Sequence, residues 1–368
     1  MAREAGGTGV IGRTLRRLAA GALSLLATLA VVELVLRTFP GIVPIDVGTA
    51  IYHVYGTAPG DIYFRDVPTR ALFMWPDFHT RAYWNGYVWD HRTDARGFRN
   101  PPELHDPALV WLGDSMIYGH GVEERDTAAA QLRSSHGIAA YNAGRQGDCL
   151  YQEYLVARLL LDALAPRTLV LTVFLNDFGD LIDLRRAEEI AEPPELAIDV
   201  SALAARIAHP RARTRPTQQL HRLKLWRLLA LARHRARGKQ VAQPAPGEPP
   251  AFLRAITEEA LWAPGARYYE QVIADLAPRA RERGAELVLL QLDVGDRVVA
   301  GALPAQDRVR ALLEAIGVAH SLRVLTTRRL FERCDECFLP HDGHLSPEGH
   351  RRLAEFLASA LREPHPRK

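Results

Sequence analysis

A serine and a histidine stand at positions from which nucleophilic catalysis can be built. Ser115 closes the triplet Gly113-Asp114-Ser115, directly after the apolar run 109–112, and Gly113 permits a sharp turn there. His344 lies near the other end of the chain, on the loop before a predicted C-terminal helix. A hydroxyl and an imidazole are groups that enzymes use to cleave acyl compounds. A lone Gly-Asp-Ser triplet, however, is also ordinary turn chemistry.

The elements around these residues follow an alternating pattern. Short apolar runs typical of strands buried on both faces occupy residues 109–112, 139–141, 169–174 and 287–290. Segments with helical spacing of apolar residues lie at 152–163, 268–283 and 306–316. This alternation predicts an α/β fold, a doubly wound parallel sheet with helices on both sides. Ser115 would then follow the first strand at its carboxyl end, where such sheets bind ligands.

Four segments, in this order, resemble the sequence blocks of the SGNH (GDSL-type) hydrolases. They are residues 113–122, 141–148, 174–177 and 340–350. The resemblance covers roughly residues 110–361 and implies a three-layer α/β/α fold of the flavodoxin-like kind. Gly97-Phe98-Arg99 also looks like a segment that precedes the serine in membrane-anchored bacterial members.

The resemblance assigns roles to individual residues. Ser115 would be the nucleophile, His344 the general base, and Asp342 the carboxylate that orients the imidazole. The oxyanion would be held by the N–H groups of Ser115 and Gly147 and by the side chain of Asn176, with Gly113 and Asp114 supporting the turn.

The sequence departs from the family pattern in two places. The family has a glycine where this chain has Phe174, which changes local geometry but leaves the Asn176 carboxamide in place. Many members separate the aspartate and histidine by two residues, whereas Asp342 and His344 are separated by one. That spacing resembles a variant found in polysaccharide O-acetylation enzymes.

The resemblance implies a serine esterase that acts on ester-linked acyl groups through an acyl-serine intermediate and needs no metal or organic cofactor. O-acyl groups of an envelope glycan are the preferred substrate class, and lipid esters come second. A membrane-tethered O-acyltransferase is the first alternative, because the triad does not decide what intercepts the acyl group. A non-catalytic binding module with the same fold is the second. The formal net charge of +3 gives no reason to expect a nucleic-acid partner.

The N-terminus has the pattern of a single-pass signal anchor. Residues 18–32 are an unbroken run of apolar and small residues, extended past Glu33 by residues 34–36, and four arginines precede it. Length and charge predict a transmembrane helix with a cytoplasmic N-terminus and a periplasmic or extracellular body. A cleaved signal peptide and a buried core helix are the alternatives. Glu33, near the end of the run, requires a partner or access to water.

We therefore expect a cytoplasmic N-terminus at 1–17, an anchor at 18–38, an aromatic-rich lead-in at 45–105 and the SGNH-like domain at 106–365. A helical insertion at about 181–265 interrupts the last of these. It is strongly basic, and Leu220, Leu223, Trp226, Leu229 and Ala230 predict an amphipathic helix that either caps the domain or lies on anionic lipid.

Aromatic residues in the lead-in either pack in short strands or offer a carbohydrate platform, and packing is the commoner outcome. Cys334 and Cys337 could form a local disulfide, remain as thiols, or join His341 and His344 in a zinc site.

Overall fold

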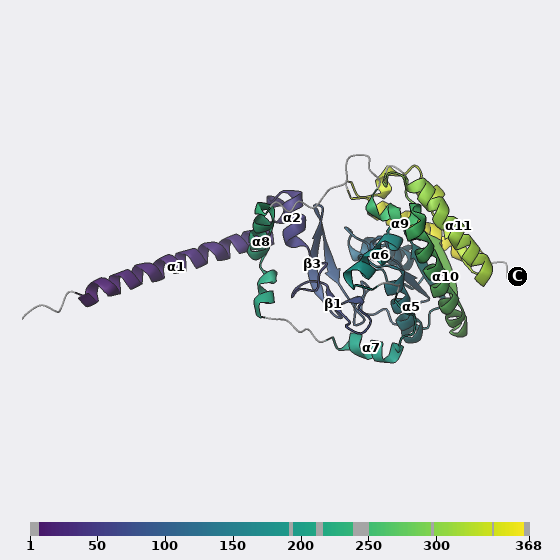
Figure 1. Ribbon diagram of the computed structural model, residues 1–368, viewed down its shortest axis with the longest axis horizontal. Coiled ribbons are helices and arrows are strands. Elements are labelled where there is room, and N and C mark those ends of the chain that lie inside the picture. The colour runs from purple at the N-terminus through teal and green to yellow at the C-terminus, as the bar shows by residue number, and fades with distance from the viewer. Residues whose placement is uncertain are drawn as a thin grey trace, which may run out of the picture.

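The computed structural model describes residues 7–190, 194–210, 216–237, 250–295, 298–340 and 342–363. His341, considered above, lies outside these ranges, as does most of 243–250, which its prolines predict to be a linker. A long helix, α1 (Gly7–Thr38), projects from a body that holds the other described elements (Figure 1).

The body is built on a five-stranded parallel sheet, which confirms the predicted fold class. In spatial order its strands are β6 (Ala140–Asn142), β5 (Leu109–Leu112), β7 (Thr168–Val173), β8 (Glu286–Gln291) and β9 (Arg323–Thr326). The strands β5, β6, β7 and β8 were predicted. The strand β9 was not predicted, because none of its residues is fully buried and it lacks an apolar run.

Helices cover both faces of this sheet. They are α4 (Ala128–His136), α5 (Leu150–Leu164), α10 (Glu259–Glu282), α11 (Ala302–His320) and α13 (Pro347–Arg362). The strands β6 and β7 lie on opposite sides of β5, so right-handed crossovers put α4 and α5 on opposite faces. The helix α13 packs on α4, and α10 contacts both α5 and α11.

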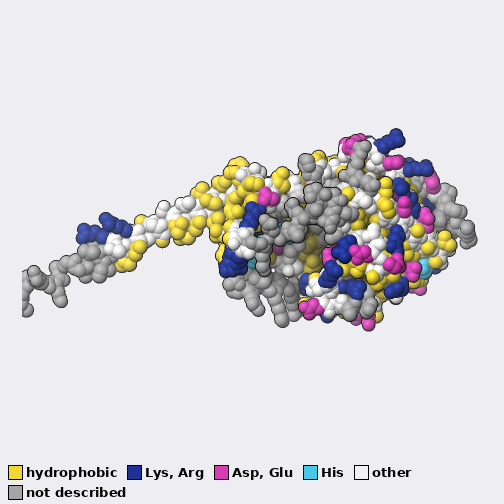
Figure 2. Space-filling model, turned by 45° about the horizontal axis from the view of Figure 1, so that its top comes forward, with side chains coloured by type: hydrophobic (Ala, Val, Ile, Leu, Met, Phe, Trp, Pro, Cys, Tyr) yellow, Lys and Arg dark blue, Asp and Glu magenta, His cyan; other side chains and the backbone are white. Residues whose placement is uncertain are grey.

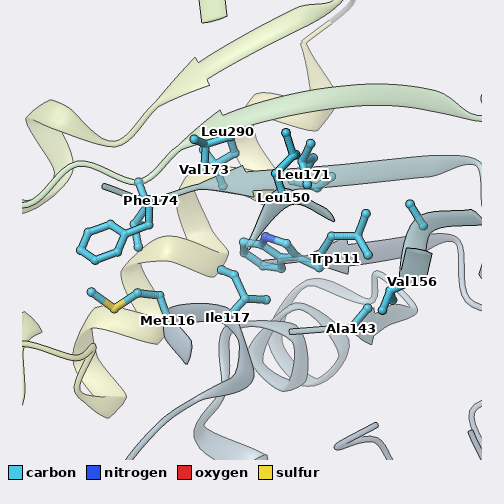
Figure 3. Close-up of a cluster of buried hydrophobic side chains, with 14 of the residues drawn as sticks. Trp111, Met116, Ile117, Ala143, Leu150, Val156, Leu171, Val173, Phe174 and Leu290 are labelled. Carbon is cyan, nitrogen blue, oxygen red and sulfur yellow. The ribbon is translucent and has the colours of Figure 1, made fainter. Parts of the chain in front are cut away.

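The core lies between these layers, around the strand that leads to Ser115. All four residues of β5 are buried. Trp111 donates from its indole to Thr172 at 2.8 Å, so its one polar atom is satisfied inside the core. Figure 3 shows Trp111 with apolar side chains of neighbouring strands and helices, next to Met116 and Ile117. The turn that carries Ser115 is therefore held by packing on both sides.

The aromatic lead-in forms a helix and two antiparallel strand pairs. These elements are α2 (Ile45–Tyr52), β1 (Tyr63–Arg65) with β2 (Leu72–Met74), and β3 (His79–Trp84) with β4 (Tyr87–Arg92). Trp89, Phe73 and Tyr63 are buried in the main core. Most of the aromatic side chains thus pack, as the commoner alternative has it.

The insertion contributes α6 (Asn176–Ala187), α7 (Val200–Ala208), α8 (Lys224–Ala236) and α9 (Arg254–Thr257). The remaining short elements are α3 (Ser115–Tyr118), α12 (Arg328–Phe331), η1 (Pro40–Ile42), η2 (Glu124–Asp126), η3 (Pro216–Arg222), η4 (Ala251–Leu253) and η5 (Asp335–Cys337). Leu220 belongs to η3, so the predicted amphipathic helix is shorter than expected. Its predicted apolar face is exposed rather than packed on the body.

The helix α8 lies against α1 and α2 at the point where α1 joins the body (Figure 1). Glu33 accepts hydrogen bonds from the backbone N–H groups of Lys224 and Leu225 at 3.0 and 2.8 Å. The carboxylate that lacked a partner in the sequence therefore caps the N-terminus of α8.

The apolar part of α1 spans Arg13–Thr38, has a mean hydropathy of 2.2 and buries none of its most apolar window in the body. The buried-core alternative is therefore wrong. By length and composition the helix can cross a membrane, and a signal sequence meets the same criteria.

Candidate active site

Ser115 opens the one-turn helix α3, immediately after β5, and is 7% exposed. Asp114 caps this helix, since its Oδ1 accepts from the N–H of Met116 at 2.9 Å. A Cβ at position 113 would lie 2.4 Å from Cγ1 of Ile117. Gly113 therefore serves close packing beneath the turn, and its φ is not in the left-handed region.

His344 is hydrogen-bonded to Ser115, 229 positions earlier in the sequence, and to a neighbouring acid. Its Nε2 lies 2.9 Å from Oγ of Ser115, and its Nδ1 is hydrogen-bonded to Oδ1 of Asp342. With Nδ1 donating to the carboxylate, Nε2 is left as an acceptor for the serine hydroxyl. The structure thus brings together the three residues that the resemblance assigned to the triad, and the one-residue spacing is no obstacle.

Asn85, which was not predicted as a site residue, binds the second carboxylate oxygen of Asp342. Nδ2 of Asn85 donates to Oδ2 of Asp342 at 2.7 Å. Burial alone would raise the pKa of Asp342, but the hydrogen bonds from His344 and Asn85 bring that pKa below its ordinary value. Asn85 occupies the β3–β4 turn with a φ of 45°. The Asn85-Gly86 pair between two strands is a hairpin signal, but nothing in the sequence linked that turn to Asp342.

His120 forms one wall of the site. Its ring stacks on that of His344 with centroids 4.1 Å apart, and Tyr55, Trp84 and Trp89 pack around it. Burial, aided by the neighbouring His344, lowers the pKa of His120 to about 3. The ring is therefore neutral at physiological pH and adds apolar support rather than charge.

Arg99 fixes the turn beyond the serine. It is fully buried, and its guanidinium donates to the carbonyls of Tyr118, Gly119 and Val122 at 2.8 to 3.1 Å. Carbonyls at a helix C-terminus carry partial negative charge, which suits a cation. The Gly97-Phe98-Arg99 segment noted in the sequence thus acts as a clamp on the end of α3.

The loop after β6 runs beside the serine turn. The N–H of Arg145 donates to the carbonyl of Gly113 at 3.0 Å, and a Cβ at Gly144 would lie 2.3 Å from the backbone nitrogen of Tyr118. Gly147 has a φ of 71°, which favours glycine. Within the described residues, the N–H groups of Ser115 and Gly147 donate to no protein acceptor. They are free for an oxyanion.

Asn176 is the first residue of α6, directly after β7. Its Nδ2 donates to Oδ2 of Asp180 at 2.7 Å, and the same side chain is also hydrogen-bonded to Asp114. Burial raises the pKa of Asp114, and hydrogen bonds from the side chains of Asn176 and Ser115 lower it in part. Asn176 therefore lies at the serine turn, as the resemblance implies.

Carboxyl groups gather behind this loop. Asp148 pairs with the buried Arg145 at 2.7 Å, yet burial raises the pKa of Asp148 to about 6. Burial likewise raises the pKa of Asp180 to about 7, and both oxygens of the buried Glu153 lack a protein partner. A low-polarity environment with few cations keeps part of this group protonated near neutral pH.

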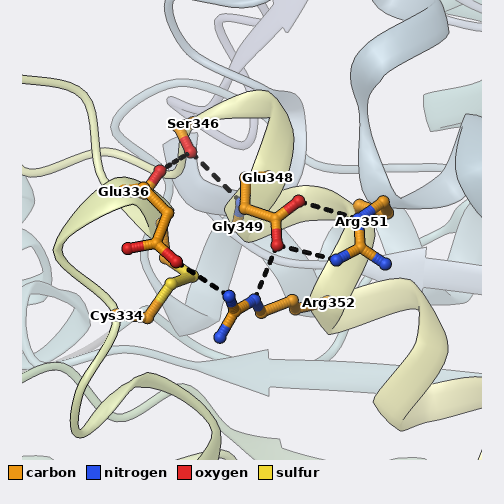
Figure 4. Close-up of a disulfide and its surroundings, with 8 residues drawn as sticks. Cys334, Glu336, Ser346, Glu348, Gly349, Arg351 and Arg352 are labelled. Carbon is orange, nitrogen blue, oxygen red and sulfur yellow. Dashed lines mark hydrogen bonds and ion pairs between the residues drawn. A yellow bond between two sulfur atoms is a disulfide. The ribbon is translucent and has the colours of Figure 1, made fainter.

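A disulfide braces the histidine loop. Cys334 and Cys337 are bonded to each other, which contradicts the zinc alternative, because that site needs both thiolates. Figure 4 shows Glu336 between the disulfide and Ser346, whose hydroxyl donates to the carbonyl of Glu336 and caps α13 by accepting from the N–H of Gly349 at 3.2 Å. The loop that carries His344 is thus fixed at both ends.

One other group of potential metal ligands lies in the site. His120, Asp342 and His344 offer ligand atoms within 4.8 Å of one another. Both nitrogens of His344 are already engaged, by Asp342 and Ser115. This arrangement suits proton transfer better than metal binding.

A pocket of about 730 Å³ adjoins the histidine loop. Asp342 and Gly343 line it together with Leu339, Val298 and Phe331. Charged side chains, Asp293, Arg328 and Glu332 among them, line it too, and of the three triad residues only Asp342 does.

No protein-family model matches this chain, and no curated protein matches it either. Among solved structures, it is similar to a lipase/acylhydrolase from Enterococcus faecalis, at 13% identity over 71% of this chain and 99% of the other, with a TM-score of 0.36. It is similar to the psychrotrophic esterase EstA from Pseudoalteromonas sp., at 10% identity over 70% and 100%, with a TM-score of 0.38. A member of the lipolytic protein G-D-S-L family from Veillonella parvula gives 11% identity over 70% and 98%, with a TM-score of 0.38. With identities and TM-scores this low, the likeness transfers no activity.

Proposed function

We propose that this protein is a serine esterase of the SGNH type that cleaves ester-linked acyl groups. One observation carries the proposal: Nε2 of His344 lies 2.9 Å from Oγ of Ser115 while Nδ1 of the same ring is bound to Asp342. A nucleophile, a base and an acid that orients the base, in this order, are the parts of a serine hydrolase.

In the proposed reaction His344 takes the proton of Ser115 as its Oγ attacks the acyl carbon. The N–H groups of Ser115 and Gly147 and the amide of Asn176 stabilise the oxyanion. His344 then protonates the leaving alkoxide, the C–O ester bond breaks, and an acyl-serine remains. Water, activated by His344, attacks this intermediate and releases a carboxylic acid.

Membrane anchoring is a further part of the proposal. We infer that α1 stays as a signal anchor and that the body lies in the periplasm or outside the cell. Arg13, Arg16 and Arg17, which precede the apolar run within α1, favour a cytoplasmic N-terminus. The Cys334–Cys337 disulfide fits an oxidising compartment. A reporter fused after Pro40 tests the topology, because cytoplasmic reporter activity would rule it out.

The substrate class follows from this location. O-acyl groups of an envelope glycan are our first choice, on the anchor and on the Asp342-x-His344 spacing, and lipid esters are second. A transferase would use the same triad and pass the acyl group to a sugar hydroxyl instead of to water. Acid release measured with and without added glycan separates the two.

The esterase proposal is tested with the full chain in detergent and an aryl acetate. We expect hydrolysis by the wild type, loss of it in Ser115→Ala, and full activity in the control Ser135→Ala, which changes an exposed serine. Wild-type turnover no faster than that of Ser115→Ala would contradict the proposal. In that case the non-catalytic binding module remains, and it predicts polymer binding that is unaffected by Ser115→Ala.

A further inference from the structure

A second pocket lies at the junction of α1 and the body. It has a volume of about 410 Å³ and is walled by the end of α1, the β3–β4 pair and the η3–α8 segment. None of the proposed triad or oxyanion residues lines it. The chemistry proposed above therefore leaves this pocket unexplained.

The pocket is lined by an excess of cations. Arg37 and Arg227 are paired with Glu33 and Asp61. The other three are Arg81, Arg222 and Lys224, and each lacks a carboxylate within ion-pair distance among the described residues. Within the described part of the chain, the pocket thus has three cations that belong to no ion pair.

Lys224 shows the consequence of this crowding. Burial, and then repulsion from Arg227 and Arg37, lowers its pKa to about 8, although Asp61 and Glu33 act in the opposite direction. Its ammonium lies 5.3 Å from the ring centroid of Tyr52. A bound anion would relieve this repulsion.

The rim of the same junction is apolar and exposed. Phe39 and Ile42, just after α1, are 58% and 62% exposed, and Trp226 and Leu229 of α8 are 41% and 58% exposed. Trp226 and Leu229 are three residues apart on one helix and so share a face. Figure 2 shows hydrophobic side chains that run along α1 and continue onto the adjoining end of the body, with basic side chains beside them.

At the end of the apolar span of α1, the junction therefore combines an exposed apolar rim that includes a tryptophan with a basic pocket. The surface of a bilayer offers matching groups: acyl chains, an interface where tryptophan is enriched, and phosphate headgroups. The Glu33 cap and the packing of Leu228 and Leu231 against α2 hold α8 in this place.

We propose that this junction is a binding site for an anionic phospholipid, with its phosphate group in the pocket at Arg81, Arg222 and Lys224 and its acyl chains along α1 and the apolar rim. The proposal rests on the membrane anchoring proposed above but not on the esterase activity. Guanidinium and ammonium groups are suited to bind a phosphodiester. The site holds the body at a fixed height above the leaflet.

The test counts lipids on the delipidated full chain in detergent by native mass spectrometry. We expect phosphatidylglycerol to bind and phosphatidylcholine to bind far less. The triple variant R81Q/R222Q/K224Q should bind phosphatidylglycerol on the order of 100-fold more weakly. The control R329Q/R333Q/R362Q removes the same charge at exposed arginines elsewhere and should bind like the wild type.

Three results would overturn the lipid site: equal binding of both lipids, equal losses in the two triple variants, and displacement of phosphatidylglycerol by inorganic phosphate at similar concentration. Binding of soluble polygalacturonate in place of the lipid would also overturn it, in favour of an acidic polymer. Hydrolysis of the aryl acetate, which requires Ser115, is independent of these outcomes. Failure of the lipid proposal and failure of the esterase proposal are therefore distinguishable.

A depth measurement tests the rim separately. A fluorophore on Leu229→Cys, in nanodiscs, should be quenched by lipids with a quencher on the acyl chain, whereas one on Val318→Cys should not. Val318 is 84% exposed on α11 and is the matched control. Cys149 is buried and the other cysteines are bonded, so the new thiol reacts selectively. Equal quenching at the two positions would contradict a membrane-facing rim.

Discussion

Nδ2 of Asn85 donates to Oδ2 of Asp342 at 2.7 Å, and so ties the turn of an N-terminal hairpin to the acid of a C-terminal loop. The hydroxyl of Tyr87 adds a second bond between the same segments, to the carbonyl of Pro340 at 2.7 Å. Because Asp342 in turn orients His344, the aromatic lead-in acts as a positioning element for the proposed base.

The variant Asn85→Gly tests this role. Glycine tolerates the positive φ at this position, so the change removes the amide without backbone strain. We expect kcat to fall roughly 10- to 100-fold, as for other groups that orient a catalytic side chain. Loss of the donor should also raise the pKa of Asp342. A shift of the acidic limb of the pH–rate profile to higher pH would reveal this effect, and an unchanged kcat and profile would contradict the role.

Asp342→Asn should remove the acceptor for Nδ1 of His344 and favour the wrong tautomer. In serine hydrolases such a change costs on the order of 10⁴-fold in kcat, and we expect a loss of this size for aryl acetate. Asp307→Asn changes an exposed aspartate and serves as the control. Retention of most activity in Asp342→Asn would show that another group orients the histidine.

Asn176→Ala should lower kcat about 10²- to 10³-fold with little change in KM, because the amide acts on the oxyanion. The hydrogen bond to Asp180 holds the carboxamide in place. Asn176→Asp keeps the size of the side chain but removes the donor, and we expect the same loss. Equal kcat in the wild type and both variants would exclude Asn176 from the oxyanion site.

The buried His350 should make the fold sensitive to acid. Burial, and then the nearby Arg99 and His344, lower the pKa of His350 from 6.5 to about 3. Between these two pKa values the unfolded chain binds a proton that the folded chain does not, so the free energy of unfolding falls as the pH falls. The contribution of His350 to stability is fully present above about pH 6.5.

In His350→Gln this dependence should weaken by about 1.4 kcal/mol per pH unit between roughly pH 6 and pH 4, because one proton is involved. Gln can replace Nδ1 as the acceptor for the N–H of Ala128. Denaturant unfolding at several pH values measures the slope. The exposed His105→Gln is the control, and equal slopes in all three proteins would contradict the buried neutral histidine.

Much of this site could be predicted from the sequence, because its blocks follow strands with strong local signals. The run of four apolar residues at β5 fixed both a buried strand and the place of Ser115. Ser346 and Pro347 marked the start of α13 and so placed His344 on a loop. Such signals need only neighbours in the chain.

What the sequence did not reveal depends on contacts between distant segments. The helix α10 begins at Glu259 rather than at about residue 268, and so includes the end of the predicted insertion. Pro264 and Gly265 predict a break, but the buried Trp262 packs on Phe178 at 4.9 Å between ring centroids and holds the first turns helical. Tertiary packing outweighs local propensity here. Asn85 and Glu33 were missed for a similar reason, since their partners are remote in sequence.

The central claim is that His344 makes the hydroxyl of Ser115 a nucleophile, and a fluorophosphonate probe tests it most directly. The probe should label the wild-type chain at a single peptide that contains Ser115. Labelling should be lost in Ser115→Ala, fall by orders of magnitude in His344→Gln, and remain unchanged in Ser135→Ala. Labelling of Ser115 at the same rate in His344→Gln, or no labelling of a folded wild-type chain, would contradict the claim.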